Sequence, residues 1–380
     1  MKKIILIPDS YKGTLSSLEV SAIMANSAKK IFPEAKVISV PIADGGEGTV
    51  AAFLQAVGGE RVVVDVHGPY MEQIAGFYGL LPDGTAVIEM AAAAGLPLVG
   101  KRLEVGLATT YGVGELMEHA LKHGAKKIIL GLGGSATNDG GCGAAAALGA
   151  VFTKADGTEF VPTGATLKDI AHVDVSALEQ KLQGIEVVAM CDITNELCGP
   201  LGAATVFGPQ KGATKEQIPL LDAGLAHMAD IIAADLDVAV KHLPGTAAAG
   251  GMGAGCAAFF KAQLVPGIEV VLNTVGFAEM LTDADVVFTG EGRVDAQSLM
   301  GKVLSGVTRE CKQKGVPVIC VAGAVENLPE EVYAHGLTAA FSINQKPLPF
   351  SEAAPLSAQN LAITMENILR LLKLNAKFAK

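Results

Sequence analysis

The segment KIILGLGGSATNDGGCG, residues 127–143, decides the fold of this chain. It opens with a short apolar run that predicts a strand at residues 127–130. A glycine-rich stretch follows and leads into a helical pattern at residues 144–150. Apolar runs without alternation of polar residues are typical of parallel strands that are buried on both faces. The segment therefore predicts a strand–loop–helix unit of an α/β protein.

The same order of elements extends outward on both sides of this segment. Further strands are predicted at residues 4–7, 37–41, 62–66, 187–190, 286–289 and 316–321. Further helices are predicted at residues 17–31, 112–123, 215–234, 298–314 and 356–374. Strands that alternate with helices define the α/β class, with a mainly parallel sheet.

One stretch breaks this alternation and suggests where the domains divide. Residues 74–80 and 85–90 predict an antiparallel hairpin around the turn Pro82-Asp83-Gly84. After residue 282 the strand–helix–strand order returns. We therefore expect residues 1–70 and 283–380 to form one Rossmann-like parallel-sheet domain from both chain ends. Residues 71–282 would form a second, inserted α/β domain.

The composition excludes several classes of protein. Half of the 380 residues are hydrophobic, which excludes intrinsic disorder, and the 45 glycines follow no collagen period. A net charge of −10 disfavours nucleic acid and membrane surfaces as partners. The six cysteines form no C-x-x-C pair, and no apolar stretch suits a signal peptide or a membrane span. These features predict a cytoplasmic protein.

Fifteen of the 45 glycines fall in four short clusters, at residues 44–49, 131–143, 250–255 and 290–295. A single cluster of this kind is most simply explained by a tight turn or by close packing of helices. Here the clusters follow predicted strands or open a predicted helix, and each contains or adjoins carboxylates or hydroxyls. Glycine-rich backbone at strand ends and helix N-termini suits anion binding. Together the clusters predict a polyphosphate site.

The type of nucleotide site is harder to predict. No G-x-x-x-x-G-K-[ST] motif is present, which excludes a P-loop enzyme. Residues 131–136 formally fit the dinucleotide pattern G-x-G-x-x-A, so an NAD-dependent oxidoreductase of a small hydroxy acid is an alternative. No strand ending in an acidic residue follows about 20 residues later, and the hydroxyls and Asp139 suit phosphate and Mg²⁺ better. A non-catalytic sensor that binds the same ligands also stays open.

Charged residues follow several of the predicted strands. Asp9 and Lys12 come after the first strand, Asp192 ends the strand at 187–190, and Glu291 and Asp295 flank Arg293. Carboxylates in such places can hold Mg²⁺ or accept a proton from an attacking hydroxyl, and basic groups can neutralise a transferred phosphoryl group. Taken singly, each carboxylate is more simply explained as a helix cap or as one partner of a surface ion pair.

Six segments, in the same order along the chain, resemble the signature segments of type I glycerate kinases. They are IPDSYKGTLS at 7–16, ADGGEGT at 43–49, GLGGSATNDGG at 131–141, DITN at 192–195, GGMGAG at 250–255 and TGEGRVD at 289–295. The resemblance extends from residue 3 to about 323, with Tyr11 in place of the usual Phe. It implies ATP-dependent phosphorylation of D-glycerate in a cleft between the two domains. It also suggests 2-phosphoglycerate as the product, although 3-phosphoglycerate stays possible.

The resemblance and the residue chemistry together assign roles as expectations. Phosphate contacts of ATP are expected from Gly133, Gly134, Ser135, Thr137, Asn138, Gly251 and Gly253. Mg²⁺ is expected at Asp139 and Glu291, and catalysis from Asp192, Asp295 and Lys12. Glycerate contacts are expected from Asp9, Ser10, Asp44, Glu47 and Arg293.

Some of these roles stay open at this point. Asp192 and Asp295 are candidates for proton acceptor and metal ligand in either order, and Lys12 and Arg293 could bind the glycerate carboxylate or the γ-phosphate. A kinase of another small hydroxy acid would keep the same loops. A monomer or a homodimer is expected.

Overall fold

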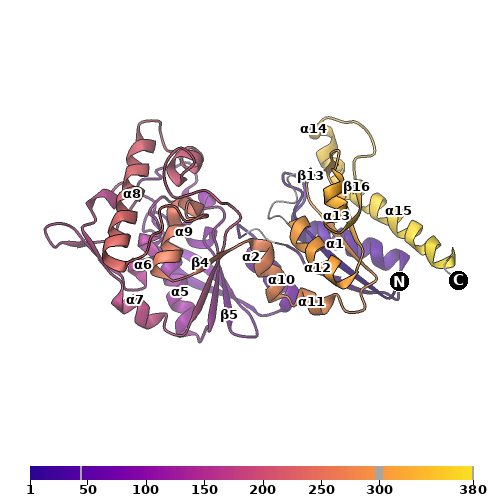
Figure 1. Ribbon diagram of the computed structural model, residues 1–380, viewed down its shortest axis with the longest axis horizontal. Coiled ribbons are helices and arrows are strands. Elements are labelled where there is room, and N and C mark those ends of the chain that lie inside the picture. The colour runs from indigo at the N-terminus through magenta and orange to yellow at the C-terminus, as the bar shows by residue number, and fades with distance from the viewer. Residues whose placement is uncertain (43–44, 296–302, 379–380) are drawn as a thin grey trace. The chain divides into compact units, whose positions relative to one another are not determined.

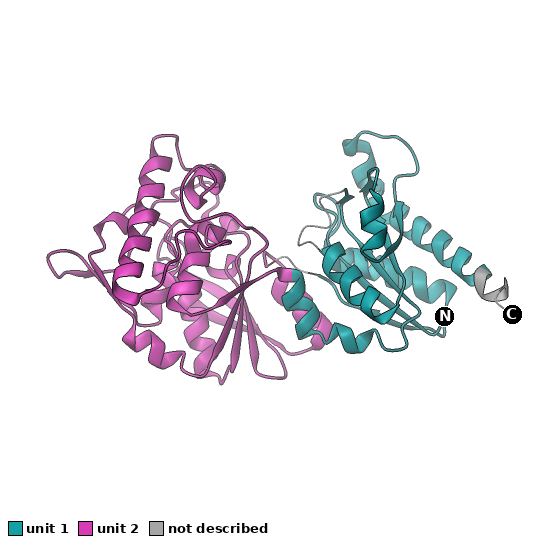
Figure 2. Cartoon of the chain, in the orientation of Figure 1, with its two compact units in different colours: residues 1–43, 268–380 teal, residues 44–267 magenta. Residues whose placement is uncertain are grey.

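The computed structural model describes residues 1–42, 45–295 and 303–378 (Figure 1). The chain divides into two compact units, drawn in two colours in Figure 2. Unit 1 comprises Met1–Ala43 and Ile268–Lys380, and unit 2 comprises Asp44–Gly267. The start of the helix predicted at 298–314 lies outside the described residues.

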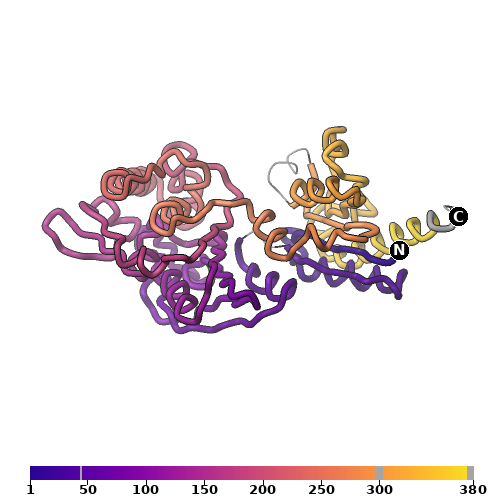
Figure 3. Tube along the Cα trace, turned by 60° about the horizontal axis from the view of Figure 1, so that its bottom comes forward, coloured from indigo at the N-terminus to yellow at the C-terminus, as the bar shows by residue number. Residues whose placement is uncertain are grey.

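Unit 1 contains a five-stranded, wholly parallel sheet in the order β16-β14-β12-β1-β2. The strands are β1 (Lys3–Pro8), β2 (Lys36–Ser39), β12 (Val286–Gly290), β14 (Val318–Ala322) and β16 (Leu337–Ser342). Figure 3 shows the indigo start of the chain in the same unit as its orange and yellow final third. The prediction of a parallel-sheet α/β fold built from both chain ends is therefore confirmed.

Helices cover this sheet because its strands are apolar on both faces. Ile4 and Leu6 of β1 share one apolar cluster with residues of α1 (Ser17–Ile31) and α15 (Ser357–Phe378). Ile5 is also fully buried, and α12 (Val303–Lys314) packs on β12 and β14. The remaining elements of unit 1 are α10 (Gly267–Thr274), α11 (Phe277–Met280), β13 (Arg293–Val294), β15 (Ala324–Val325), α13 (Glu330–Ala334) and α14 (Phe350–Ala353).

Unit 2 contains a six-stranded mixed sheet in the order β11-β10-β6-β5-β4-β3. The strands β5 (Thr85–Glu89), β6 (Lys127–Gly131), β10 (Glu186–Met190) and β11 (Gln263–Val265) are parallel to one another. β4 (Gln73–Leu80) pairs antiparallel with β5, which confirms the predicted hairpin. β3 (Glu60–His67) also pairs antiparallel with β4, although we expected a parallel strand at 62–66. The short link between them allows only a hairpin, because a parallel crossover needs a dozen or more residues.

The bounds of the two units differ from the expected junctions at 70/71 and 282/283. β3 is bonded along its whole length to β4, and α2 (Thr49–Val57) packs on β4 and β5. Residues 44–70 therefore belong with unit 2. Glu269 of α10 forms an ion pair with Arg309 of α12, and Gly306 packs closely against Ile268. Residues 268–282 therefore belong with unit 1.

Helices and a small sheet complete unit 2. The helices are α3 (Ala91–Ala94), α4 (Leu96–Val99), α5 (Tyr111–Lys122), α6 (Cys142–Ala147), α7 (Ser176–Lys181), α8 (Gln217–Leu236) and α9 (Ala248–Phe259). Short turns of 3₁₀ or π helix occur at η1 (Leu167–Asp169), η2 (Ala203–Phe207) and η3 (Pro209–Lys211), and β7 (Val151–Thr153), β8 (Glu159–Phe160) and β9 (His172–Asp174) pair with one another. In the part of the chain that the structure describes, no helix combines the length and apolar character needed to cross a membrane.

Candidate functional site

Two predicted site segments leave the sheet of unit 2 at one edge. Gly131, at the end of β6, is in register with Glu89 at the end of β5 and with Met190 at the end of β10. The central glycine loop (residues 131–141) therefore starts between Glu89 and the segment that carries Asp192. Ligands of parallel sheets bind at this carboxyl edge.

The central glycine loop packs backbone to backbone against residues 45–46. A Cβ atom on Gly131 would lie 2.4 Å from the carbonyl oxygen of Gly45, and one on Gly133 would lie 2.6 Å from Cα of Gly46. The amide of Gly133 donates to the Gly45 carbonyl at 2.9 Å. Both glycines are thus required by packing, and the Gly133 amide is engaged within the protein. Gly134, which is exposed and has a φ of +74°, is the more accessible of the two predicted phosphate contacts.

The glycines at 250–255 pack against the same loop from the side of α9. A Cβ atom on Gly250 would lie 1.9 Å from the carbonyl oxygen of Thr137, and one on Gly251 3.0 Å from Cα of Gly140. A Cβ atom on Gly253 would lie 2.4 Å from the carbonyl oxygen of Gly245. Gly251 and Gly253 are buried, so the structure gives them a packing role, and their nucleotide contact stays a prediction.

Asp139 anchors the central glycine loop to the start of α5. Its carboxylate is fully buried and accepts hydrogen bonds from the amide and hydroxyl of Thr110, at 2.7 and 2.8 Å, and from the amides of Gly141 and Gly143. Burial raises the pKa of Asp139, and these hydrogen bonds oppose that rise. These hydrogen bonds occupy the acceptor sites of the carboxylate. They therefore favour a structural role for Asp139, in holding the loop, over the role of metal ligand that the sequence suggested.

The loop runs for several residues before a helix begins. α6 starts at Cys142, six residues after Ala136. A dinucleotide fingerprint would instead open directly into a helix whose N-terminus faces the pyrophosphate. The geometry therefore disfavours the oxidoreductase alternative.

Lys211 was missed by sequence reasoning. It ends η3 and is 3% exposed, and its Nζ donates to Oγ of Ser135 at 2.7 Å and to the carbonyl of Thr137 at 2.8 Å. Burial lowers the pKa of Lys211 to about 7, while the field of Asp139 opposes that change. The flanking Pro209 and Gly212 indicate only a turn, so no sequence signal connects this lysine with the loop.

Glu89 is a second functional candidate that the sequence did not reveal. The carboxylate is buried at the end of β5 and accepts a hydrogen bond from the amide of Val50 at 2.7 Å, near the start of α2. Burial raises the pKa of Glu89, and the amides of Val50 and Gly48 oppose the rise. The carboxylate therefore holds the 45–50 segment, including exposed Glu47, to the sheet edge.

Asp192 lies at the same edge of unit 2. Its side chain is exposed, and Oδ1 accepts a hydrogen bond from the amide of Gly267 at 2.8 Å. This bond ties the carboxylate to Gly267, the last residue of unit 2. Its position at a strand end is as predicted, and its catalytic role stays a prediction.

Unit 1 brings its predicted site residues to one edge as well. Pro8 of β1 is in register with Gly290 of β12, so Asp9 and Glu291 follow adjacent strand ends. The amide of Asp9 donates to the Gly290 carbonyl at 2.8 Å, and Gly292 packs against the Tyr11–Lys12 backbone. The residues gathered here are Asp9, Ser10, Lys12, Glu291, Arg293 and Asp295. Asp44 lies outside the described residues.

Two side chains of this edge have defined partners. The exposed guanidinium of Arg293 forms an ion pair with Glu326 and lies 4.0 Å from Oδ2 of Asp295. The hydroxyl of Tyr11 is buried and donates to the carbonyl of Val321. Burial raises the pKa of Tyr11 well above its ordinary value, so the hydroxyl is a neutral structural donor.

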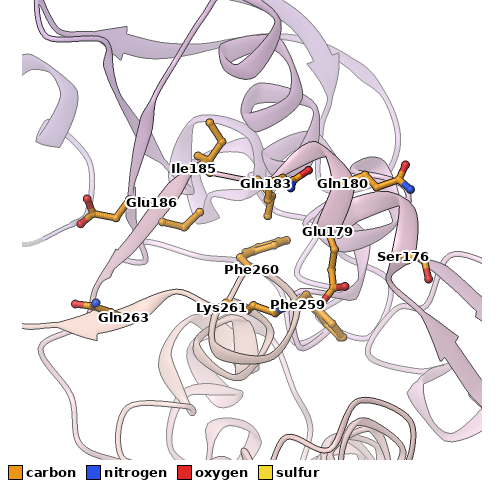
Figure 4. Close-up of a pocket in the computed structure, with 13 residues that line it drawn as sticks. Ser176, Glu179, Gln180, Gln183, Ile185, Glu186, Phe259, Phe260, Lys261 and Gln263 are labelled. Atoms are coloured by element: carbon orange, nitrogen blue, oxygen red, sulfur yellow. Dashed lines mark ion pairs between the residues drawn. The ribbon is translucent and has the colours of Figure 1, made fainter.

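A hollow of about 650 Å³ lies at the other end of the unit 2 sheet (Figure 4). It is lined by α7, by the segment that leads into β10 and β11, and by Phe259 and Phe260 at the end of α9. Lys261 and Glu179 form an ion pair at 2.7 Å beside it. Because Glu186 and Gln263 start their strands, this hollow lies at the amino edge, away from the glycine loops, and no predicted site residue lines it.

No cluster of three or more His, Cys, Asp or Glu side chains suited to a metal occurs among the described residues. Mg²⁺ commonly uses only one or two protein carboxylates together with substrate phosphates, so a smaller donor set is compatible with its use.

Two parallel-sheet edges that carry glycine loops, carboxylates and basic groups define an α/β phosphotransferase, and comparison with known proteins agrees. Residues 4–373 match the model of the glycerate kinase family. The chain belongs to the glycerate kinase family.

Individual relatives cover nearly the whole chain. It is 45% identical to a glycerate kinase of Halalkalibacterium halodurans, over 93% of each chain. It is 43% identical to a glycerate 2-kinase of Escherichia coli, over 99% of this chain and 100% of that one. A crystal structure from Salmonella typhimurium LT2, provisionally described as a glycerate kinase 2, matches with a TM-score of 0.87 at 44% identity over 99% of both chains.

Proposed function

We propose that the protein transfers the γ-phosphoryl group of ATP to D-glycerate and releases ADP and 2-phosphoglycerate. The observation that carries this proposal is the near-complete alignment with kinases named for glycerate, including the glycerate 2-kinase of Escherichia coli at 43% identity. Attack by the other hydroxyl would give 3-phosphoglycerate instead. Two further proposals are that the enzyme acts in the cytoplasm and that it is a monomer or a homodimer.

The edge of unit 2 supplies the proposed nucleotide contacts. Gly134 is exposed beside Ser135, and Thr137 and Asn138 follow in the same loop. Backbone amides and hydroxyls in such a loop can donate to phosphate oxygens. Gly133, Gly251 and Gly253 support the shape of the loop through their close packing.

The edge of unit 1 supplies the proposed contacts to glycerate and to the transferred group. Lys12 and Arg293 are exposed cations among the carboxylates of Asp9, Glu291 and Asp295. A cation in this position can bind the glycerate carboxylate or neutralise charge on the phosphoryl group. Asp9 and Ser10 of unit 1, and Asp44 and Glu47 of unit 2, are the other proposed substrate contacts.

Asp192 and Asp295 are the proposed candidates for the group that accepts the proton of the attacking hydroxyl. Both follow strands, and both lie within residues 4–373, which match the family model. Phosphoryl transfer needs little covalent work from the protein, so orientation and charge neutralisation would provide most of the rate enhancement.

Glu291 is the proposed magnesium ligand at this edge, because its carboxylate offers the oxygen donors that the ion prefers and follows a strand end of the parallel sheet. When bound with ATP, the ion would neutralise charge on the phosphates. Asp139 has no part in this proposal, because its acceptor sites are used by the loop itself.

The proposal is tested by measuring ADP release with Mg²⁺ and ATP, in the presence of D-glycerate, tartronate or hydroxypyruvate. D-glycerate should give the highest kcat/KM. Faster turnover of another acid would indicate a different small-acid kinase, and no stimulation by any hydroxy acid would contradict the proposed activity. A parallel assay for nicotinamide absorbance with glycerate should show no change.

A further inference from the structure

Lys211 is a buried cation that the proposed mechanism does not use. The two hydrogen bonds of its ammonium group go to neutral oxygens of Ser135 and Thr137, and among the described residues no carboxylate, including that of Asp139 whose charge acts on it, forms an ion pair with it within 4 Å. A buried ammonium without a carboxylate partner is costly, because the interior solvates charge poorly. Such a group suggests that a negative charge arrives with a ligand.

The neighbouring side chains provide a second, independent observation. Oγ1 of Thr137 and both polar atoms of the Asn138 amide are buried and have no hydrogen-bond partner among the described residues. Buried polar atoms in native proteins nearly always have partners, and an exception needs an explanation. These three atoms belong to residues two and three positions after Ser135, in the loop that Lys211 contacts.

The chemistry of the Lys211–Ser135 contact fixes the direction of the Ser135 hydroxyl. An ammonium group has donors only, so Oγ of Ser135 must accept the hydrogen bond at 2.7 Å. The proton of that hydroxyl is then left to donate to another oxygen. Ser135 is itself 5% exposed and follows exposed Gly134, so its hydroxyl lies just beneath the exposed part of the loop.

We propose that Lys211 is a positioning residue for a phosphate-binding site, where it orients the Ser135 hydroxyl toward a phosphate oxygen of a bound nucleotide. Its charge, acting from a poorly solvated position behind the loop, also favours the anion. The inference rests on the proposed use of ATP. Lys211 would supply the positive charge that residues 131–141 do not contain. No bond is made or broken by Lys211.

The protonation of Lys211 distinguishes this role from a purely structural one, because only a phosphate-binding role links nucleotide binding to proton uptake. Because burial lowers its pKa to about 7, the free protein loses this charge as the pH rises through neutrality. A bound phosphate raises the pKa again, so binding above pH 7 must take up a proton. The charge of Asp139 acts on Lys211 and raises its pKa. Leu103 packs against Gly212, the residue after Lys211. The charged neighbours of Leu103, Arg102 and Glu104, form an ion pair with each other at the surface.

The experiment is calorimetric titration of the full-length protein with ADP, adenosine and inorganic phosphate, at pH 6.5 and 8.5, in two buffers of different ionisation enthalpy. Wild-type protein should take up a substantial fraction of a proton on binding ADP at pH 8.5, and adenosine should cause no uptake. The variant Lys211→Met should bind ADP about tenfold more weakly at pH 6.5, with unchanged adenosine affinity and reduced proton uptake at pH 8.5. Lys215→Met, an exposed lysine of the same segment, should behave as wild type.

Equal ADP affinity and equal proton uptake in Lys211→Met and wild type would overturn the inference. If Lys211→Met weakens the binding of inorganic phosphate but not that of ADP, the assignment of the site to a nucleotide is overturned. If Lys211→Met does not fold, the wild-type titration still decides, since an absence of proton uptake at pH 8.5 contradicts the role. Ser135→Ala should also weaken ADP but not adenosine. Failure of the proposed function is distinct, because it would appear as absent glycerate phosphorylation while ADP binding and its proton uptake persist.

Discussion

At the scale of single residues, the buried polar groups determine how the central glycine loop is held. Asp139 belongs to the loop and accepts hydrogen bonds from the amides of Gly141 and Gly143, and buried Lys211 donates one to the carbonyl of Thr137. Asp139 was recognised in the sequence as a polar residue of the loop, but its burial was not. Only the folded chain shows that its oxygens face the amides of Gly141, Gly143 and Thr110.

Replacement of Asp139 tests the anchoring role. Asp139→Ala should lower the free energy of unfolding by about 3 kcal/mol, because several buried donors lose their acceptor. Urea unfolding measures this change. Asp156→Ala is the matched control, since Asp156 accepts a backbone hydrogen bond in an exposed turn and should cause a much smaller loss. A stable Asp139→Ala protein that has lost only its Mg²⁺ dependence would restore the metal role suggested by the sequence.

Tyr11 provides a second prediction at this scale. Tyr11→Phe removes only the hydroxyl and leaves the carbonyl of Val321 without this donor. We expect a loss of about 1 kcal/mol in unfolding free energy with unchanged kcat, because the hydroxyl is a buried structural donor. A large fall in kcat without loss of stability would instead place the hydroxyl in the catalytic machinery.

At the scale of elements, three glycine clusters interlock at one sheet edge of unit 2. The sequence allowed either close packing or anion binding for each cluster, and the distances at Gly131, Gly133 and Gly250 establish packing for these positions. The longer helices and most of the parallel strands could be predicted because their apolar patterns are regular, whereas the parallel strands β11 and β16 and most of the short helices were not predicted. The antiparallel direction of β3 could not be predicted, because its run of valines resembles a parallel strand. Its direction is set by its pairing with the neighbouring strand β4.

Substitution within this interlock should be far more damaging than elsewhere. In Gly131→Ala the new methyl group would lie 2.4 Å from the carbonyl of Gly45, so loss of about 3 kcal/mol or failure to fold is expected. Gly106→Ala is the control, because its nearest neighbour would lie at an ordinary 3.5 Å. Thermal unfolding compares the two variants, and equal midpoints would show that the loops can separate at little cost.

At the scale of the whole molecule, the order of the signature segments predicted the family. The two units divide at 43/44 and 267/268, whereas the sequence suggested junctions at 70/71 and 282/283. Asp192 belongs to unit 2 and Asp295 to unit 1, so the proposed chemistry draws on both. The sequence located both carboxylates at strand ends. It could not reveal Lys211 or Glu89, because their partners are distant in the chain and follow no motif.

Variants of these two carboxylates test whether both units contribute to catalysis. Asp192→Asn and Asp295→Asn should each reduce kcat by about a hundredfold or more, if one accepts the proton and the other positions the reacting groups. Steady-state ADP release measures the change, and circular dichroism checks the fold. Near-normal turnover in both variants would remove them from the catalytic set.

The most direct test of the central claim is an NMR spectrum of the product formed from ATP and D-glycerate by the wild-type protein. Our proposal predicts a single phosphorylated glycerate that carries the phosphoryl group on the oxygen of C2, together with one equivalent of ADP. A spectrum that shows only unchanged glycerate, under conditions in which the protein is folded and binds ADP, would contradict it.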